Sequence, residues 1–167
     1  MPRRYLLLAL TGEAAERVQR MRREWDPVMA ERISPHLTLI YPQEVDNEEL
    51  LLQRVAEVAS RTAPFDVRPG RAERSNLGGV WLRVVDESGT WSRLRATILT
   101  PPFAPYPVTP HVTIVHPRTS PWSSEALAAM NGAGIEQTSQ LDEIIYTETG
   151  RRGTKVLERF QLEGING

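Results

Sequence analysis

Ser-Pro-His-Leu-Thr-Leu-Ile-Tyr-Pro at residues 34–42 returns as Thr-Pro-His-Val-Thr-Ile-Val-His-Pro at residues 109–117. We call these stretches the first and the second motif. They align without a gap, share four identical residues and pair similar side-chain shapes at most other positions. Such a match between two similar strand and helix contexts indicates an internal duplication. We therefore expect two lobes that face each other, with one motif in each.

Alternation along a strand gives each motif a polar face. Side chains at i and i+2 point to the same side of a strand, so His36 lies beside Thr38, and His111 beside Thr113. Positions i and i+2 are roughly 6 to 7 Å apart, so an imidazole and a hydroxyl can reach different atoms of one phosphate. A polar face on an apolar strand is expensive to bury unless it lines a wet cleft. The duplication then sets two such faces across one cleft.

Periodicity and turn residues give the remaining elements. Leucine-rich residues 4–11 predict a strand, and apolar residues at helical spacing over 13–31 predict a helix that Pro27 breaks or ends. The same signals predict strands at 35–41, 65–74, 79–85, 111–116, 135–140, 144–149 and 156–162, and helices at 47–61, 87–99 and 121–131. A proline-rich passage at 101–107 connects the lobes. Strands that arrive in hairpins as often as across helices predict an α+β fold with a mainly antiparallel sheet.

Length and composition bound the class of protein. The 167 residues, 40% hydrophobic and 25% charged, predict a single bilobal domain over 1–167 with a substantial core. The absence of cysteine excludes disulfides and thiolate metal sites. The apolar stretch at residues 5–10 is too short to span a bilayer. We expect a cytoplasmic monomer that does not enter a membrane.

Charge limits the partners. Twenty basic and 21 acidic residues give a net charge of -1, so no extended nucleic-acid surface is predicted and any nucleotide ligand is short or terminal. Four arginines cluster in one segment, at positions Arg17, Arg20, Arg22 and Arg23. Such a run is more often a solvated helix face, and a local basic patch is the alternative interpretation.

The paired motifs resemble the defining mark of the 2H phosphoesterase superfamily, two His-x-Thr-hydrophobic sequences on related strands, here at 36–39 and 111–114. The resemblance is strongest to its bacterial 2′-5′ RNA ligase-like, or RNA 2′,3′-cyclic phosphodiesterase, branch. It implies a LigT-like α+β fold, bilobal and duplicated, with mainly antiparallel sheets lining a central cleft and helices outside. Substrates in this superfamily include RNA ends, cyclic nucleotides and cyclic oligonucleotide signals, so the resemblance implies a reaction class rather than one substrate.

Two imidazoles suit the opening of a cyclic phosphodiester, which needs a base for water and an acid for the leaving ribose oxygen. Histidine has an unperturbed pKa near 6.5, and each such group contributes roughly 10²- to 10⁴-fold. Thr38 and Thr113 are predicted to donate hydrogen bonds to the non-bridging phosphate oxygens. Neither a metal nor another cofactor is required. The resemblance implies that His36 is the acid and His111 the base, and the near symmetry of the motifs leaves swapped roles open.

Four further side chains are candidates for ligand contact: Tyr41, His116, Trp81 and Trp122. Tyr41 and His116 occupy equivalent motif positions, and alternation turns both away from the His-Thr face unless the strand ends or bulges there. The three aromatic side chains can stack on a base, with core or rim packing as the more frequent role.

The predicted function is metal-independent hydrolysis of a 2′,3′-cyclic phosphate on a nucleotide or short RNA end, or of a related short phosphodiester. One alternative is a nucleotide- or RNA-end-binding module of the same fold without turnover, whose signature would be an altered histidine or threonine. Another is 2′-5′ RNA ligase activity, which would use the same residues. A hydrolytic metal site is the remaining rival, and the spacing of the three histidines supports it poorly.

Overall fold

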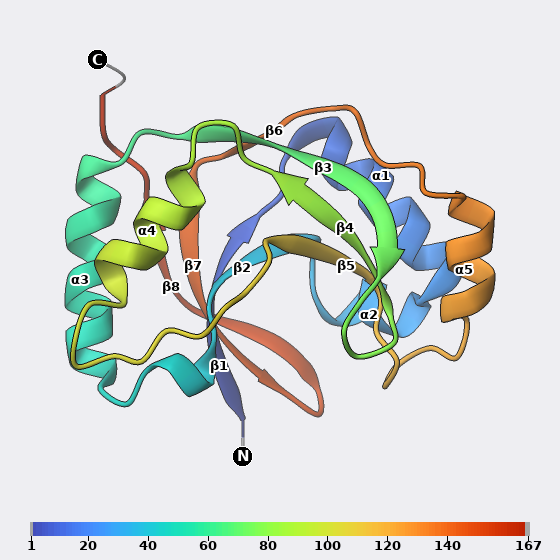
Figure 1. Ribbon diagram of the computed structural model, residues 1–167. Helices are drawn as coiled ribbons and strands as arrows, with labels where there is room; N and C mark the ends of the chain where they lie inside the picture. Colours follow the sequence, from blue (N-terminus) through green and yellow to red (C-terminus); the bar gives the residue numbers. More distant parts are fainter. Residues whose placement is uncertain (1, 166–167) are drawn as a thin grey trace.

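The computed structural model describes residues 2–165 and contains two four-stranded antiparallel sheets with helices outside them (Figure 1). The first sheet has the order β2-β1-β7-β8, with β1 at Arg3–Ala9, β2 at His36–Ile40, β7 at Glu143–Gly150 and β8 at Gly153–Gln161. The second has the order β5-β4-β3-β6, with β3 at Phe65–Arg74, β4 at Val80–Val85, β5 at His111–Val115 and β6 at Ser139–Leu141. This arrangement confirms the predicted α+β fold with antiparallel sheets.

The helices cover one side of each sheet. They are α1 (Gly12–Trp25), α2 (Pro27–Arg32), α3 (Glu48–Arg61), α4 (Thr90–Ile98) and α5 (Ser123–Met130), with a short 3-10 helix η1 at Pro42–Glu44. Figure 1 shows α3 and α4 beside the first sheet, and α1 and α5 beside the second. In the described part of the chain, no helix has the length and apolar character needed to cross a membrane.

The two motifs form equivalent edge strands. The first motif is the edge strand β2, which pairs with β1, and the second is the edge strand β5, which pairs with β4. These two edges lie next to each other at the junction of the sheets (Figure 1). The duplicated sequence therefore occurs at equivalent places in two similar sheets.

Both motif strands contain the same irregularity. Ile40 and Thr38 pair with consecutive residues of β1, which leaves Leu39 as the extra residue of a bulge. Val115 and Thr113 likewise pair with consecutive residues of β4, with Ile114 as the extra residue. A one-residue bulge shifts the alternation of side chains beyond it. Without the bulge, the residue after each strand would face away from the histidine and threonine. With the bulge, that residue can lie on the His-Thr face.

Apolar motif residues fix the register of both strands. Leu37 and Leu39 in β2, and Val112 and Ile114 in β5, are at most 1% exposed. They belong to one hydrophobic core that continues through both sheets. Burial of each such side chain stabilises the fold by about 1.5–3 kcal/mol, and a one-residue slip would turn it outward. Packing on one face therefore holds the histidines and threonines on the other.

The break predicted at Pro27 is confirmed, because Pro27 starts α2 and the Asp26 carboxylate caps this helix by accepting a hydrogen bond from the Met29 amide. The chain departs from the predicted elements at two places. The helix predicted from residue 87 begins at Thr90, after Gly89 adopts a left-handed φ of 70°. The strand prediction for 135–140 is wrong for most of its length, since β6 begins at residue 139.

Two backbones approach closely just before this segment. A Cβ atom on Gly134 would meet the Gly70 carbonyl oxygen at 2.0 Å, and a single bridge joins Gly134 to Arg71. Ile135 is buried, but residues 135–138 are not part of a strand.

Candidate active site

Both motif histidines have the same hydrogen-bonded tautomer. His36 Nδ1 lies 2.8 Å from the carbonyl oxygen of Ser34, and His111 Nδ1 lies 2.7 Å from that of Thr109. A carbonyl oxygen only accepts, so each Nδ1 carries a proton and each Nε2 keeps its lone pair. Ser34 and Thr109 both precede a proline, which restricts their backbone to extended conformations. The repeated Pro-His pair therefore sets the same ring nitrogen free in both motifs.

The surroundings keep both imidazoles neutral. Burial, reinforced by the positive charge of Arg22 and by the nearby titratable ring of His111, lowers the pKa of His36 to about 3. Burial also lowers the pKa of His111, against the effect of its hydrogen bond to Thr109. The action of one histidine on the other reflects the adjacency of β2 and β5. At neutral pH the ligand-free protein thus presents two unprotonated Nε2 atoms.

Trp81 stacks on the second motif histidine. The ring centroids of Trp81 and His111 are 4.1 Å apart with an interplanar angle of 30°. Trp81 Nε1 donates to the Glu73 carboxylate at 2.8 Å, and Arg83 forms an ion pair with the same carboxylate at 3.0 Å. These two partners, Trp81 first, lower the pKa of Glu73. Glu73, which the sequence did not single out, therefore holds the ring that packs on His111.

Tyr41 lies beside the first motif threonine. Burial raises the pKa of Tyr41, while an interaction with the Thr38 side chain acts in the opposite direction. The ring also makes edge contacts with Tyr106 at 5.6 Å and Tyr5 at 6.3 Å between centroids. The bulge at Leu39 thus brings Tyr41 to the His-Thr face, next to a small cluster of tyrosines.

The two remaining candidates differ in position. His116 follows β5; its Nδ1 accepts a hydrogen bond from the Arg118 amide at 3.1 Å, so its proton is on Nε2, the reverse of the motif histidines. Trp122 is 52% exposed at the start of α5, on the outer side of the second sheet (Figure 1). Among residues 2–165, no three His, Asp or Glu side chains gather closely enough to hold a metal ion.

A match to a protein-family model decides the family. The model of the 2′-5′ RNA ligase superfamily matches residues 11–152, which include both motifs. The chain belongs to this superfamily. The resemblance to the 2H phosphoesterases is therefore confirmed, and membership supports an enzyme of the phosphoesterase or ligase type. No curated protein matches the sequence.

Solved structures show that this member of the 2′-5′ RNA ligase superfamily shares its fold with distant relatives. TT0787 of Thermus thermophilus superposes with a TM-score of 0.64 at 18% identity, covering 98% of this chain and 100% of its own. E. coli LigT complexed with NADP+ gives 0.64 at 19% identity, covering 98% and 99%. E. coli LigT complexed with 3′-AMP gives 0.62 at 20% identity, covering 97% and 99%.

A buried ion pair holds the first motif strand of this superfamily member. Arg95 of α4 donates to the Leu39 carbonyl at 2.7 Å and pairs with Glu44 at 2.5 Å. The same Glu44 carboxylate accepts the backbone N–H of Tyr41, the residue just after β2, at 3.0 Å. Both side chains are buried. The free edge of β2 is therefore fixed by a guanidinium and a carboxylate.

The second motif strand has a matching pair of contacts. Arg22 of α1 donates to the Thr113 carbonyl at 2.9 Å, and Asp26 accepts the N–H of His116, just after β5, at 2.9 Å. Helix α1 precedes the first motif and α4 precedes the second, so each helix holds the motif strand of the other repeat. The expectation of a solvated face is wrong for Arg22, which is 0% exposed. Its spacing of four from Val18, on the buried stripe of α1, is the signal that would have found it.

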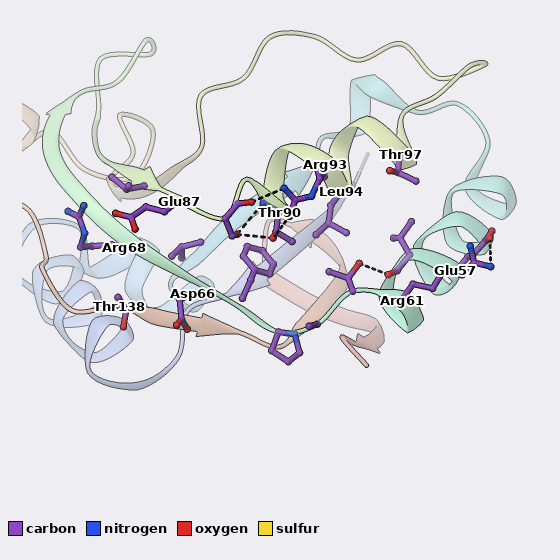
Figure 2. Close-up of a pocket in the computed structure, with 18 of the residues that line it drawn as sticks. Glu57, Arg61, Asp66, Arg68, Glu87, Thr90, Arg93, Leu94, Thr97 and Thr138 are labelled. Atoms are coloured by element: carbon purple, nitrogen blue, oxygen red, sulfur yellow. Dashed lines mark hydrogen bonds and ion pairs between the residues drawn. The ribbon is translucent and has the colours of Figure 1, made fainter. Parts of the chain in front are cut away.

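A cavity of about 1020 Å³ lies between α3, α4 and the adjoining ends of β3 and β4 (Figure 2). Trp81, Arg83 and Val85 alternate along β4, so they share the face of His111, which pairs with Arg83. Val85 and its cross-strand partner Arg68 line the cavity. Other lining residues come from α3, the α3–β3 connection, β3, the β4–α4 turn and α4, among them Arg61, Asp66, Glu87, Thr90 and Arg93. The cavity thus begins two residues along β4 from the position opposite His111.

Proposed function

We propose that the chain hydrolyses the 2′,3′-cyclic phosphate of a nucleotide or short RNA end without a metal. His36 and His111 are the proposed acid-base pair, and Thr38 and Thr113 the proposed phosphate ligands. The observation that supports this best is the equivalence of the motifs: two adjacent edge strands, each with a histidine whose Nε2 is unprotonated. Membership of the 2′-5′ RNA ligase superfamily supports the reaction class.

The proposed reaction consumes one water. His111 Nε2 takes a proton from water, and the water oxygen forms a bond to phosphorus on the side opposite the leaving ribose oxygen. The bond between phosphorus and that ribose oxygen breaks, and the oxygen receives a proton from His36. The products are a ribose hydroxyl and a phosphomonoester. Thr38 and Thr113 donate hydrogen bonds to the non-bridging oxygens, where negative charge is held in the transition state.

The acid must gain its proton when substrate binds. His36 is neutral in the ligand-free protein, because its pKa lies near 3. A phosphate anion next to the ring favours the imidazolium and raises this pKa. His36 therefore takes up a proton when the substrate binds and then transfers it to the leaving ribose oxygen.

A nucleotide suits the surroundings of the two motifs. Tyr41 offers a partly buried ring beside Thr38, where a base or ribose can pack. The cavity beyond Arg83 supplies arginines for a neighbouring phosphate and carboxylates for ribose hydroxyls. E. coli LigT, a relative in fold, has been crystallised with ATP, NADP+ and 3′-AMP. These features support a short nucleotide substrate.

The test is product analysis of the purified protein in EDTA with 2′,3′-cyclic nucleotides, cyclic-phosphate-ended RNA and 2′-5′ dinucleotides. We expect opening of a cyclic phosphate, a loss of activity of about 10²-fold or more in His36→Ala, and no loss in Trp122→Ala, whose side chain is exposed at the start of α5. An intact panel, with nucleotide still bound, would favour the binding module. Equal rates in wild type and His36→Ala would refute the site.

A further inference from the structure

Arg22 is a fully buried cation between the two motifs. Its Nε donates to the Thr113 carbonyl and its Nη1 to the Ile33 carbonyl, both at 2.9 Å. Ile33 lies three residues before His36, so the guanidinium joins the approach to the first motif to the strand of the second. Burial lowers the pKa of Arg22 to about 10, which leaves it charged at neutral pH.

The charge of Arg22 is less compensated than that of its counterpart, Arg95. Arg95 forms a direct ion pair with Glu44. Within residues 2–165, Arg22 has no such ion pair, and its buried Nη2 has no hydrogen-bond partner. Asp26 acts on Arg22 through its charge, but its carboxylate is occupied by three donors, from Met29 N, His116 N and Thr119 Oγ1. A buried N–H without a partner is costly, so the position of Nη2 calls for an explanation.

The field of Arg22 falls on the first motif. The groups that oppose a proton on His36 are Arg22 from α1 and the titratable His111 from β5, and the Ser34 carbonyl opposes both through its hydrogen bond. Arg22 does not act in this way on His111, where burial and the Thr109 carbonyl are the causes. Arg22 therefore gives two motifs of nearly identical sequence different electrostatic surroundings.

We propose that Arg22 is a positioning residue that fixes the second motif strand and makes proton uptake by His36 depend on the binding of a phosphate anion. This rests on the proposed function, in which His36 is the acid. In the free protein the buried cation opposes a proton on His36. A bound phosphate anion offsets that cation, so His36 takes a proton from solvent and later gives it to the leaving oxygen.

The first test is an NMR titration of the His36 ring, with and without sodium sulfate, a tetrahedral anion that does not titrate in this range. In wild type we expect sulfate to raise the His36 midpoint by about one pH unit or more. Arg22→Met should raise the midpoint without sulfate and reduce the sulfate shift. Arg17→Met removes a charge from the same helix at a side chain that contacts Gln137, and should behave as wild type.

The second test separates charge from position by kinetics on a 2′,3′-cyclic nucleotide. Arg22→Lys keeps the charge but cannot contact both carbonyls, so its His36 titration should match wild type while kcat falls. Arg22→Met should lose about 10²-fold in kcat with a smaller change in KM. Arg17→Met should keep the wild-type kcat.

Three results would overturn parts of the inference or its basis. A folded Arg22→Met protein with the wild-type His36 titration and sulfate shift would refute the coupling. Wild-type kcat in Arg22→Lys would refute the positioning role, and this variant decides if Arg22→Met does not fold. Absence of turnover in wild type would refute the proposed function instead, while the sulfate titration would still decide whether Arg22 controls His36.

Discussion

His36 and His111 carry the same tautomer in different electrical surroundings. The Arg22 cation acts on His36, whereas the Trp81 ring stacks on His111. Two motifs of nearly equal sequence thus present imidazoles of unequal basicity. This inequality is consistent with the different roles that we propose for the two rings, acid for His36 and base for His111.

The nature of the leaving group separates these roles. A phosphodiester that releases p-nitrophenolate needs no proton on the departing oxygen. His36→Ala should therefore keep most of the wild-type rate on this substrate, although it loses about 10²- to 10⁴-fold on a cyclic phosphate. His111→Ala should lose activity on both substrates, as measured by steady-state kinetics. The reverse pattern would exchange the two assignments.

Protonation of His36 should lower the stability of the fold in acid. The folded-state pKa of His36 is about 3, below its unfolded value near 6.5, so between these values the unfolded chain binds the extra proton. Stability should therefore fall as pH drops below about 6.5, and go on falling to about 3. Urea unfolding at about pH 7.5 and about pH 5 measures the fall in the free energy of unfolding between these pH values. This fall should be smaller for His36→Asn than for wild type. An equal loss in both proteins would contradict this.

At the scale of elements, the two motif strands and their bulges determine which side chains meet. Alternation predicted that the histidine and threonine of each motif share a face, and that the intervening apolar residues are buried. The bulge at Leu39 and its copy at Ile114 have no local sequence signal, because they depend on how neighbouring strands pair. The side of the sheet on which Tyr41 lies therefore needed the structure.

Other features escaped prediction because they depend on contacts distant in sequence. Arg22 is buried since its side chain spans from α1 to β5, which a run of arginines in one segment does not reveal. The stack of Trp81 on His111 and the role of Glu73 come from cross-strand register. Of the strand expected at 135–140, only residues 139 and 140 are strand, and the close approach of Gly134 to Gly70 just before it joins segments distant in sequence.

The pair that holds β2 should dominate the stability of this edge. Arg95→Met leaves the buried Glu44 carboxylate without its cation, so we expect a loss of about 3–5 kcal/mol in the free energy of unfolding. Arg4→Met breaks a solvent-exposed pair with Glu48 and should cost about 0–1 kcal/mol. Urea unfolding of both variants measures the difference. Similar losses would show that the buried pair does not fix the strand.

At the scale of the whole molecule, β4 leads from Arg83, which pairs with His111, to Val85 at the edge of the cavity in Figure 2. Val85 lies two residues along β4 from Arg83, a separation of roughly 7 Å. That distance suits the next nucleotide of a chain whose terminal phosphate lies between the motifs. We therefore expect this part of the protein to discriminate between substrates of different length.

Removal of one cavity arginine should discriminate against longer substrates. Arg68→Ala should raise KM roughly tenfold for a cyclic-phosphate-ended trinucleotide, the effect of one lost hydrogen bond to a charged group. Its KM for a cyclic mononucleotide, which does not reach the cavity, should not change. Arg151→Ala, at the exposed β7–β8 turn, is the control for a general loss of charge. Equal effects on both substrates would exclude the cavity from binding.

The central claim is that one phosphate lies between the two motifs, and a crystal structure with a bound nucleoside 3′-monophosphate tests it most directly. We predict the phosphate within hydrogen-bonding distance of Nε2 of both His36 and His111, and of the hydroxyls of Thr38 and Thr113. A phosphate bound by one motif alone, or at a site away from both, would contradict the proposed mechanism.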